Sequence, residues 1–132
     1  MNRFVLFICA VCFTLSACKG GNQDNSRTYY LSGKIRSEAH IHGGLLDGVS
    51  VEYYESGNRK GEANYRSGLL DGKATSNYEN GQTKSTATYK DGVLNGVSAN
   101  WYPDGQKMSE ATFIMGSLQG KVAEWEPNGT PK

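Results

Sequence analysis

Hydrophobic and polar positions follow two different patterns along the 132-residue chain. Near the amino terminus, an apolar run extends from Phe4 to Leu15 and follows a single cation, Arg3. A membrane-spanning helix needs about 20 apolar residues, so this run is short for a permanent span and typical of a secretory signal. Beyond residue 18, apolar residues alternate with polar ones and show no helical period. The pattern predicts a leader followed by an all-β segment.

The β segment carries a repeat of 24 residues. Thirteen of the 17 glycines fall into three series with this spacing, and the aromatic residues keep the same register. The glycine series are 33-57-81-105-129, 44-68-92-116 and 48-72-96-120. One aromatic column is Tyr30, Tyr54, Tyr78 and Tyr102; the other is Tyr65, Tyr89 and Phe113, with the aliphatic Ile41 at its first position. Repeats of this length indicate an array in which each unit packs against its neighbours.

Each unit is predicted to be a β-hairpin. In one unit, the β-branched and aromatic stretch from Val49 to Glu55 predicts a strand, and residues 58–66 predict its return. Between them lies Ser56-Gly57, which is replaced by Asn-Gly or Asp-Gly in later units. Such pairs favour type I′ turns, so a tight two-residue turn is predicted there. A Gly-x-Leu-x-Gly segment is predicted to connect successive units.

The array predicts a single-layer antiparallel β-meander of about nine short strands over residues 28–132. Leu, Ile, Val and Phe supply only 16 of the 115 residues from position 18 onward, too few for a thick core. The aromatic columns therefore have to bury the sheet. The same 115 residues carry 13 cations and 13 acids, so they are neutral and offer no electrostatic reason to expect nucleic acid as a partner.

The second full unit carries a family resemblance. Its order Gly72-Lys73, Tyr78-Glu79-Asn80-Gly81 and Tyr89-Lys90-Asp91-Gly92 resembles the bacterial variant of the MORN repeat. The resemblance extends from Tyr30 to Gly129 and implies a hairpin-repeat scaffold without shared catalytic residues. Related chains are often labelled antitoxin-like, which implies neutralisation of a partner toxin as one alternative. The chain departs from the pattern at Asn77 and Glu126, where aromatic residues are expected.

The end of the leader carries a second resemblance. Leu15-Ser16-Ala17-Cys18 resembles the lipobox of bacterial lipoproteins, which implies a signal peptide at residues 1–17 and a lipid on Cys18. Residues 18–27 are then the lipidated cysteine and a polar, flexible tether. Lys19 is not the aspartate of an inner-membrane retention signal, so an outer-membrane or cell-surface place in the bacterial envelope is expected. Cys9 and Cys12 lie in the leader, which leaves no thiol for other chemistry.

Catalytic and metal-binding candidates are few. Glu38, His40 and His42 alternate along one predicted strand face and form the weak candidate for a metal site. Equivalent positions in the next unit are ordinary polar surface residues, so neither a metal nor another cofactor is expected. No nucleophile stands in a recognisable setting with a base, and an enzyme is not expected.

The aromatic ladders are the candidate binding surface. Their members are Tyr54, Tyr78 and Tyr102 on one face and Tyr53, Trp101 and Trp125 on the other. These rings either pack the sheet itself or bind a linear ligand such as a peptide, a glycan strand or another protein's edge. The leading prediction is a lipid-anchored, non-catalytic protein-interaction scaffold whose partner is an unidentified envelope protein. An antitoxin-like binder and a glycan or cell-wall binding module are the alternatives.

Overall fold

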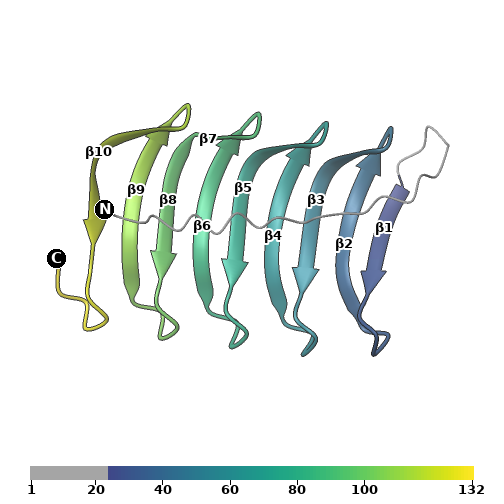
Figure 1. Cartoon of the computed structure of the whole chain (residues 1–132), viewed down its shortest axis with the longest axis horizontal. Coiled ribbons are helices and arrows are strands. Elements are labelled where there is room, and N and C mark those ends of the chain that lie inside the picture. Colours follow the sequence, from purple (N-terminus) through teal and green to yellow (C-terminus); the bar gives the residue numbers. More distant parts are fainter. Residues whose placement is uncertain (1–23) are drawn as a thin grey trace.

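A computed structural model describes residues 24–132. These residues form one open antiparallel sheet of ten strands, ordered β1-β2-β3-β4-β5-β6-β8-β9-β10, with β7 paired to β6. Figure 1 shows the strands side by side in chain order, with β1 at one end and β10 at the other. This arrangement confirms the single-layer antiparallel meander. The described part of the chain contains no helix with the length and apolar character needed to cross a membrane.

The strands are short and regularly spaced. Their bounds are β1 Asp24–Tyr29, β2 Ile35–His42, β3 Leu45–Tyr53, β4 Arg59–Arg66, β5 Leu69–Asn77, β6 Thr83–Lys90, β7 Val93–Leu94, β8 Gly96–Trp101, β9 Lys107–Ile114 and β10 Ser117–Glu124. The two-residue β7 is separated from β8 by Asn95, which gives ten strands where about nine were expected. Residues 24–27 belong to β1, so the expected tether is wrong over those four positions. The predicted signal peptide, Cys18 and the earlier part of the tether lie outside the described residues.

The turns along the lower edge in Figure 1 differ from the prediction. After β3, the N–H of Gly57 donates to the carbonyl of Tyr54 at 2.9 Å, and the N–H of Tyr54 donates to the carbonyl of Asn58 at 2.8 Å. Gly57 has a φ of +96°, whereas Ser56 stays in the ordinary negative region. This geometry is a type I turn closed by a bulge glycine. The predicted type I′ turn at Ser56-Gly57 and its equivalents is wrong, because only the glycine adopts a positive φ.

Type I′ turns occur at the upper edge instead. Between β4 and β5, Ser67 and Gly68 have φ values of +48° and +82°, and they connect the paired residues Arg66 and Leu69. Two consecutive residues with positive φ match the right-handed twist of the flanking strands. Apart from Gly68, which lies in the turn, the predicted Gly-x-Leu-x-Gly connection is therefore part of β5. Its second glycine, Gly72, sits in a bulge within that strand and has a φ of +115°.

The two faces of the sheet can be assigned from the strand pairing. Directly paired residues of antiparallel strands share a face, and alternate residues along a strand return to it. We call the side that carries the alanines of β2, β4, β6 and β9 the alanine face; these are Ala39, Ala63, Ala87 and Ala111. Ala39, Ala63 and Ala111 are only 3–4% exposed, and among the described residues no large side chain is completely buried. The sheet is therefore held by a thin apolar layer and by hydrogen bonds between units.

Candidate binding surface

A column of tyrosines joins the units along the lower edge. Each hydroxyl donates a hydrogen bond to a backbone carbonyl 23 residues further along the chain, in the next unit. The bonds are Tyr30 to Tyr53 at 2.6 Å, Tyr54 to Asn77 at 2.8 Å, Tyr78 to Trp101 at 2.8 Å and Tyr102 to Trp125 at 3.1 Å. A buried phenol normally needs such a partner. The column containing Tyr54, Tyr78 and Tyr102 therefore serves packing between units, one of the two interpretations left open by the sequence.

A second column of hydrogen bonds joins the units along the upper edge. The turn glycine of each unit donates its N–H to the leucine carbonyl of the preceding unit. These bonds are Gly68 to Leu46 at 2.8 Å, Gly92 to Leu70 at 2.7 Å and Gly116 to Leu94 at 2.8 Å. Neighbouring units are thus fixed at both edges as well as along their strands, which holds the sheet's faces in a defined register.

On the face opposite the alanines, Tyr53 belongs to a polar cluster. Its hydroxyl donates to Glu38 at 3.0 Å, and Arg27 donates to the same carboxylate at 2.7 Å. The hydrogen bond from Tyr53, followed by that from Arg27, lowers the pKa of Glu38 below its usual value. Burial, followed by the hydrogen bond to Glu38, raises the pKa of Tyr53. The cluster links β1, β2 and β3. The hydroxyl of Tyr53 therefore has a structural role in holding these strands together.

The same cluster bears on the weak metal candidate. Glu38 already binds Arg27 and Tyr53, while His40 and His42 are exposed further along β2. Within residues 24–132, no group of three or more His, Cys, Asp or Glu side chains is arranged to hold a metal ion. The geometry thus gives no support to a metal site at these three residues.

Trp101 and Trp125 are half-buried near the lower edge. Their carbonyls accept the hydroxyls of Tyr78 and Tyr102, and the ammonium of Lys107 lies 5.7 Å from the ring centre of Trp125. An ammonium over an indole face is a favourable cation–π contact. The backbone carbonyls of both tryptophans are therefore bonded within the sheet, and the ring of Trp125 has an internal cation–π contact.

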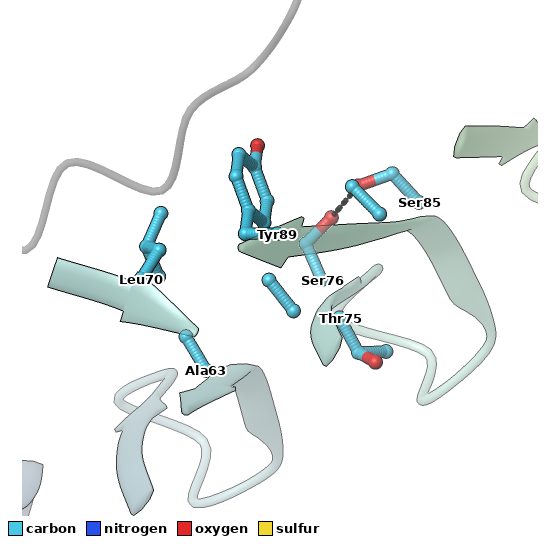
Figure 2. Close-up of a pocket in the computed structure, with 8 residues that line it drawn as sticks. Ala63, Leu70, Thr75, Ser76, Ser85 and Tyr89 are labelled. Atoms are coloured by element: carbon cyan, nitrogen blue, oxygen red, sulfur yellow. Dashed lines mark hydrogen bonds between the residues drawn. The ribbon is translucent and has the colours of Figure 1, made fainter. Parts of the chain in front are cut away.

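The alanine face contains a shallow hollow across β4, β5 and β6. It is lined by Ala63, Leu70, Ala74, Thr75, Ser76, Ser85, Ala87 and Tyr89. Figure 2 shows Leu70 and Tyr89 projecting at one end of the hollow and the bonded pair Ser76 and Ser85 at the other. The volume of the hollow is about 30 Å³, far below the several hundred Å³ of a typical small-molecule site. Its shape fits a side chain of a larger partner better than a metabolite.

The hollow is one segment of a surface that repeats with the units. Apolar residues form a strip near the upper edge of the alanine face, and they pair across strands as Tyr65 with Leu70 and Tyr89 with Leu94. Small residues form the floor beside this strip, where Ala74 pairs with Ala63 and Ala87. The 24-residue register of the sequence contained both the apolar column and the small-residue column. That the two columns lie side by side depends on the bulges in the strands, and the sequence did not predict it.

Cations border the alanine face on its lower side. The guanidinium of Arg36 lies 6.0 Å from the ring centre of Tyr30, and the ammonium of Lys84 lies 5.6 Å from that of Tyr78. Between them, Lys60 pairs with Glu52 at 3.3 Å. We call Arg36, Lys60 and Lys84 the cation row. The surface thus combines an apolar strip, a small-residue floor and a positively charged border.

These features define a class of open, single-sheet repeat protein that presents extended surfaces rather than a deep pocket. Residues 25–42, 46–67, 70–91 and 94–115 match the MORN repeat variant, and these four repeats cover more than half of the chain. The chain belongs to the MORN repeat variant family. Such repeats indicate a protein that binds other proteins or membranes, and their all-β fold is generally a non-catalytic binding module. A search of curated proteins gives no match.

Proposed function

We propose that this protein is a lipid-anchored, non-catalytic scaffold of the bacterial envelope that binds an acidic, amphipathic segment of a partner protein on its alanine face. The observation that carries the proposal is the continuous alanine face, on which no other element of residues 24–132 packs. A single-layer sheet with one apolar strip repeated over several units fits an elongated protein ligand, since a small molecule would contact only one unit.

The apolar part of the partner is suggested by the strip and the floor. Tyr89 and Leu70 project beside a floor of alanines, so side chains from a partner can descend to the sheet between them (Figure 2). Burying an apolar side chain of ordinary size contributes about 1.5–3 kcal/mol, and the repeat offers such a position in each unit. The affinity then comes from several shallow contacts in a row.

The acidic part of the partner is suggested by the cation row. Arg36 and Lys84 are held above tyrosine rings, which reduces the rotamer freedom that each loses on binding a carboxylate. Charges at the rim of an interface mainly set orientation and association rate. A partner segment that places apolar residues on the strip and carboxylates beside the cation row would match both features of the alanine face.

The membrane attachment in this proposal is supported by Leu15-Ser16-Ala17-Cys18 at the end of the apolar leader. Several acyl chains on one cysteine give durable anchoring, because each buried methylene contributes about 0.8 kcal/mol. An anchor at residue 18 lies only six positions before β1, so the sheet stays close to the membrane surface. A scaffold placed there meets envelope proteins rather than cytoplasmic ones.

Site-specific photocross-linking tests the binding surface. A photoreactive residue replaces Ala87 on the alanine face or Thr86, its neighbour on the opposite face, in the full-length chain within its own membranes. We expect one discrete cross-linked partner from position 87 and none from position 86. In the position-87 chain, Lys60→Glu with Lys84→Glu lowers the yield at least tenfold, because the cation row then repels the acidic segment.

The control is Lys73→Glu, which reverses one lysine charge instead of two, on an exposed position of the opposite face. Equal cross-linking from both positions, or an equal loss with Lys73→Glu, would contradict the proposal. Loss of binding with Trp101→Ala alone would point instead to the glycan module. A captured partner that is toxic without this protein, and harmless with it, would identify the antitoxin-like alternative.

A further inference from the structure

The small residues of the alanine face form a continuous row across the strands. An alanine or a serine stands at the same level in every strand from β2 to β9, apart from the two-residue β7. We call this row the trough; its residues are Ala39, Ser50, Ala63, Ala74, Ala87, Ser98 and Ala111. The hollow in Figure 2 is part of it. An elongated ligand in the trough therefore crosses the strands and follows the row of units seen in Figure 1.

The contacts that the trough offers recur at a fixed distance. Each 24-residue unit contributes two neighbouring strands to the sheet. Neighbouring strands lie about 4.7–4.9 Å apart, so the unit spacing is about 9.4–9.8 Å. Arg36, Lys60 and Lys84 of the cation row follow one another at this spacing, because they are equivalent residues one repeat apart. A ligand that makes the same contacts in every unit has to repeat its own side chains at the same distance.

Of the regular backbone conformations, polyproline II matches the unit spacing best. It has three residues per turn and rises about 3.1 Å per residue, so each turn advances about 9.3 Å. An α-helix needs seven residues, about 10.5 Å, to present nearly the same side again. A tilt that removes the excess would move the helix about 4 Å off the trough in every unit. A β-strand faces the sheet with every second residue, about every 6.6 Å, and falls out of step with the units.

We propose that the trough binds an acidic polyproline II segment of the partner protein, with one left-handed turn in each unit. This inference rests on the proposed function and gives the partner segment its conformation and spacing. In each turn one apolar residue points to the apolar strip, one carboxylate points to the cation row, and the third residue points away from the sheet. Aromatic-lined grooves commonly bind such segments, and Tyr65, Tyr89 and Phe113 supply one ring per unit.

Hydroxyl groups beside the trough suit the backbone of such a segment. Polyproline II has no internal hydrogen bonds, so its carbonyls need donors from water or from the binding surface. The hydroxyls of Ser76 and Ser85 bond to each other at 2.6 Å, which uses one of their two hydrogens. In the next unit the amide of Asn100 donates to the hydroxyl of Ser109 at 3.0 Å. Each pair therefore retains a hydroxyl hydrogen that can bond to a carbonyl of the ligand.

Synthetic peptides test the spacing with the detergent-solubilised full-length chain. The probe is a fluorescent peptide of three Leu-Pro-Glu triads, and its affinity is measured by fluorescence anisotropy. The comparison peptide keeps every proline in place but exchanges leucine and glutamate in alternate triads, which breaks the three-residue period. We expect the probe to bind at least tenfold more tightly than the comparison peptide. Equal affinities would overturn the proposal.

Single charge reversals locate the bound probe. Lys84→Glu removes one cation of the row and is expected to weaken binding at least fivefold. The matched control is Lys73→Glu, which makes the same single change at an exposed position of the opposite face and is expected to leave the affinity unchanged. An equal loss with both variants would overturn the placement of the segment in the trough.

Met108 provides a test in which binding is gained. It occupies the position of the cation row in the unit after Lys84. We expect Met108→Lys to strengthen the binding of a four-triad peptide at least threefold, because a fourth carboxylate then meets a cation. The three-triad probe should gain no more than twofold, from its second register on the longer row. An equal gain for both peptides would contradict one turn per unit.

The remaining outcomes separate this inference from the proposed function. An acidic amphipathic peptide with heptad spacing that binds more tightly than the triads, and is weakened by Lys84→Glu, would overturn the polyproline II conformation and leave the scaffold function standing. The absence of triad binding, with a partner still cross-linked from position 87, would do the same. The absence of both would contradict the inference and the proposed function together.

Discussion

A tyrosine hydroxyl is the smallest part of the molecule that joins one repeat to the next. The 24-residue register predicted the tyrosine column, because the same residue type recurs at equivalent positions. It did not predict the acceptors, since each is a backbone carbonyl that any residue can supply. Tyr53, Asn77, Trp101 and Trp125 all provide the same acceptor despite their different side chains. Sequence patterns therefore revealed the ring positions and missed the bonds that give them a role.

Replacing Tyr78 by Phe tests this role. The substitution keeps the ring under Lys84 but removes the bond to the Trp101 carbonyl. We expect the free energy of unfolding to fall by about 1 kcal/mol, because a half-buried carbonyl loses its partner. Denaturant titration followed by tryptophan fluorescence measures the change. Tyr29→Phe, at an exposed position, serves as the control; an equal loss there would contradict a specific role for the Tyr78 hydroxyl.

The pKa of Glu38 predicts a pH dependence at the amino-terminal end of the sheet. Because the hydrogen bond from Tyr53 lowers this pKa from 4.5, the stabilising contribution is complete above about pH 5 and is lost as the pH falls through the folded-state value. We expect Glu38→Gln to be less stable than the native chain at pH 7. The difference should narrow as the pH falls through the folded-state pKa and the native carboxylate becomes protonated. Thermal unfolding from pH 3 to pH 8 measures it, and a constant difference would show that ionisation of Glu38 is irrelevant.

At the scale of the element, glycine-containing turns connect successive strands at both the lower and the upper edge of the sheet. Asn-Gly and Asp-Gly pairs at the lower edge predicted type I′ turns, but these occur at the upper edge. Pair preferences alone could not separate the two, because Asp91-Gly92 and Ser67-Gly68 at the upper edge have similar turn chemistry. The deciding factor is which strand residues pair beside each turn, and pairing depends on the whole sheet.

Met115 is the upper-turn residue least suited to its backbone conformation. Its φ is +48°, a region that costs most side chains about 1–2 kcal/mol and that asparagine tolerates well. We expect Met115→Asn to raise the free energy of unfolding by about 0.5–1 kcal/mol. Thermal unfolding of dilute protein measures the gain. Asp91→Asn is the comparison, since aspartate already tolerates this conformation; a similar gain there would indicate a cause other than backbone strain.

For the whole molecule, the sequence predicted the arrangement of the strands better than the features of the alanine face. Periodicity and alternation were enough for the single-layer meander, because each unit contacts only its neighbours. The hollow at Ala63, Leu70 and Tyr89 was missed because the bulge at Gly72 decides which columns lie side by side. Alternation put the candidate residues Tyr53, Trp101 and Trp125 on one face, yet their contacts could only be found in the folded sheet.

The proposed attachment of the whole molecule to the membrane rests on one residue, Cys18. We expect Cys18→Ser to abolish labelling with a radioactive fatty acid and to move the protein from the membrane fraction to the soluble fraction. The expected loss is nearly complete, because the apolar surface of the sheet cannot replace several acyl chains. Leu31→Ser, an exposed control in the first lower turn, should stay with the membrane. Unchanged labelling and fractionation of Cys18→Ser would contradict lipid attachment.

The two columns of inter-unit hydrogen bonds have a consequence for how such a protein can change over generations. Every bond in them joins residues almost one repeat apart, and each unit donates and accepts in the same way. Recombination between two equivalent codons removes or duplicates 24 residues and leaves each remaining donor facing an acceptor of the same kind. The length of the sheet can therefore vary by copy number, while the contacts between neighbouring repeats stay unaltered.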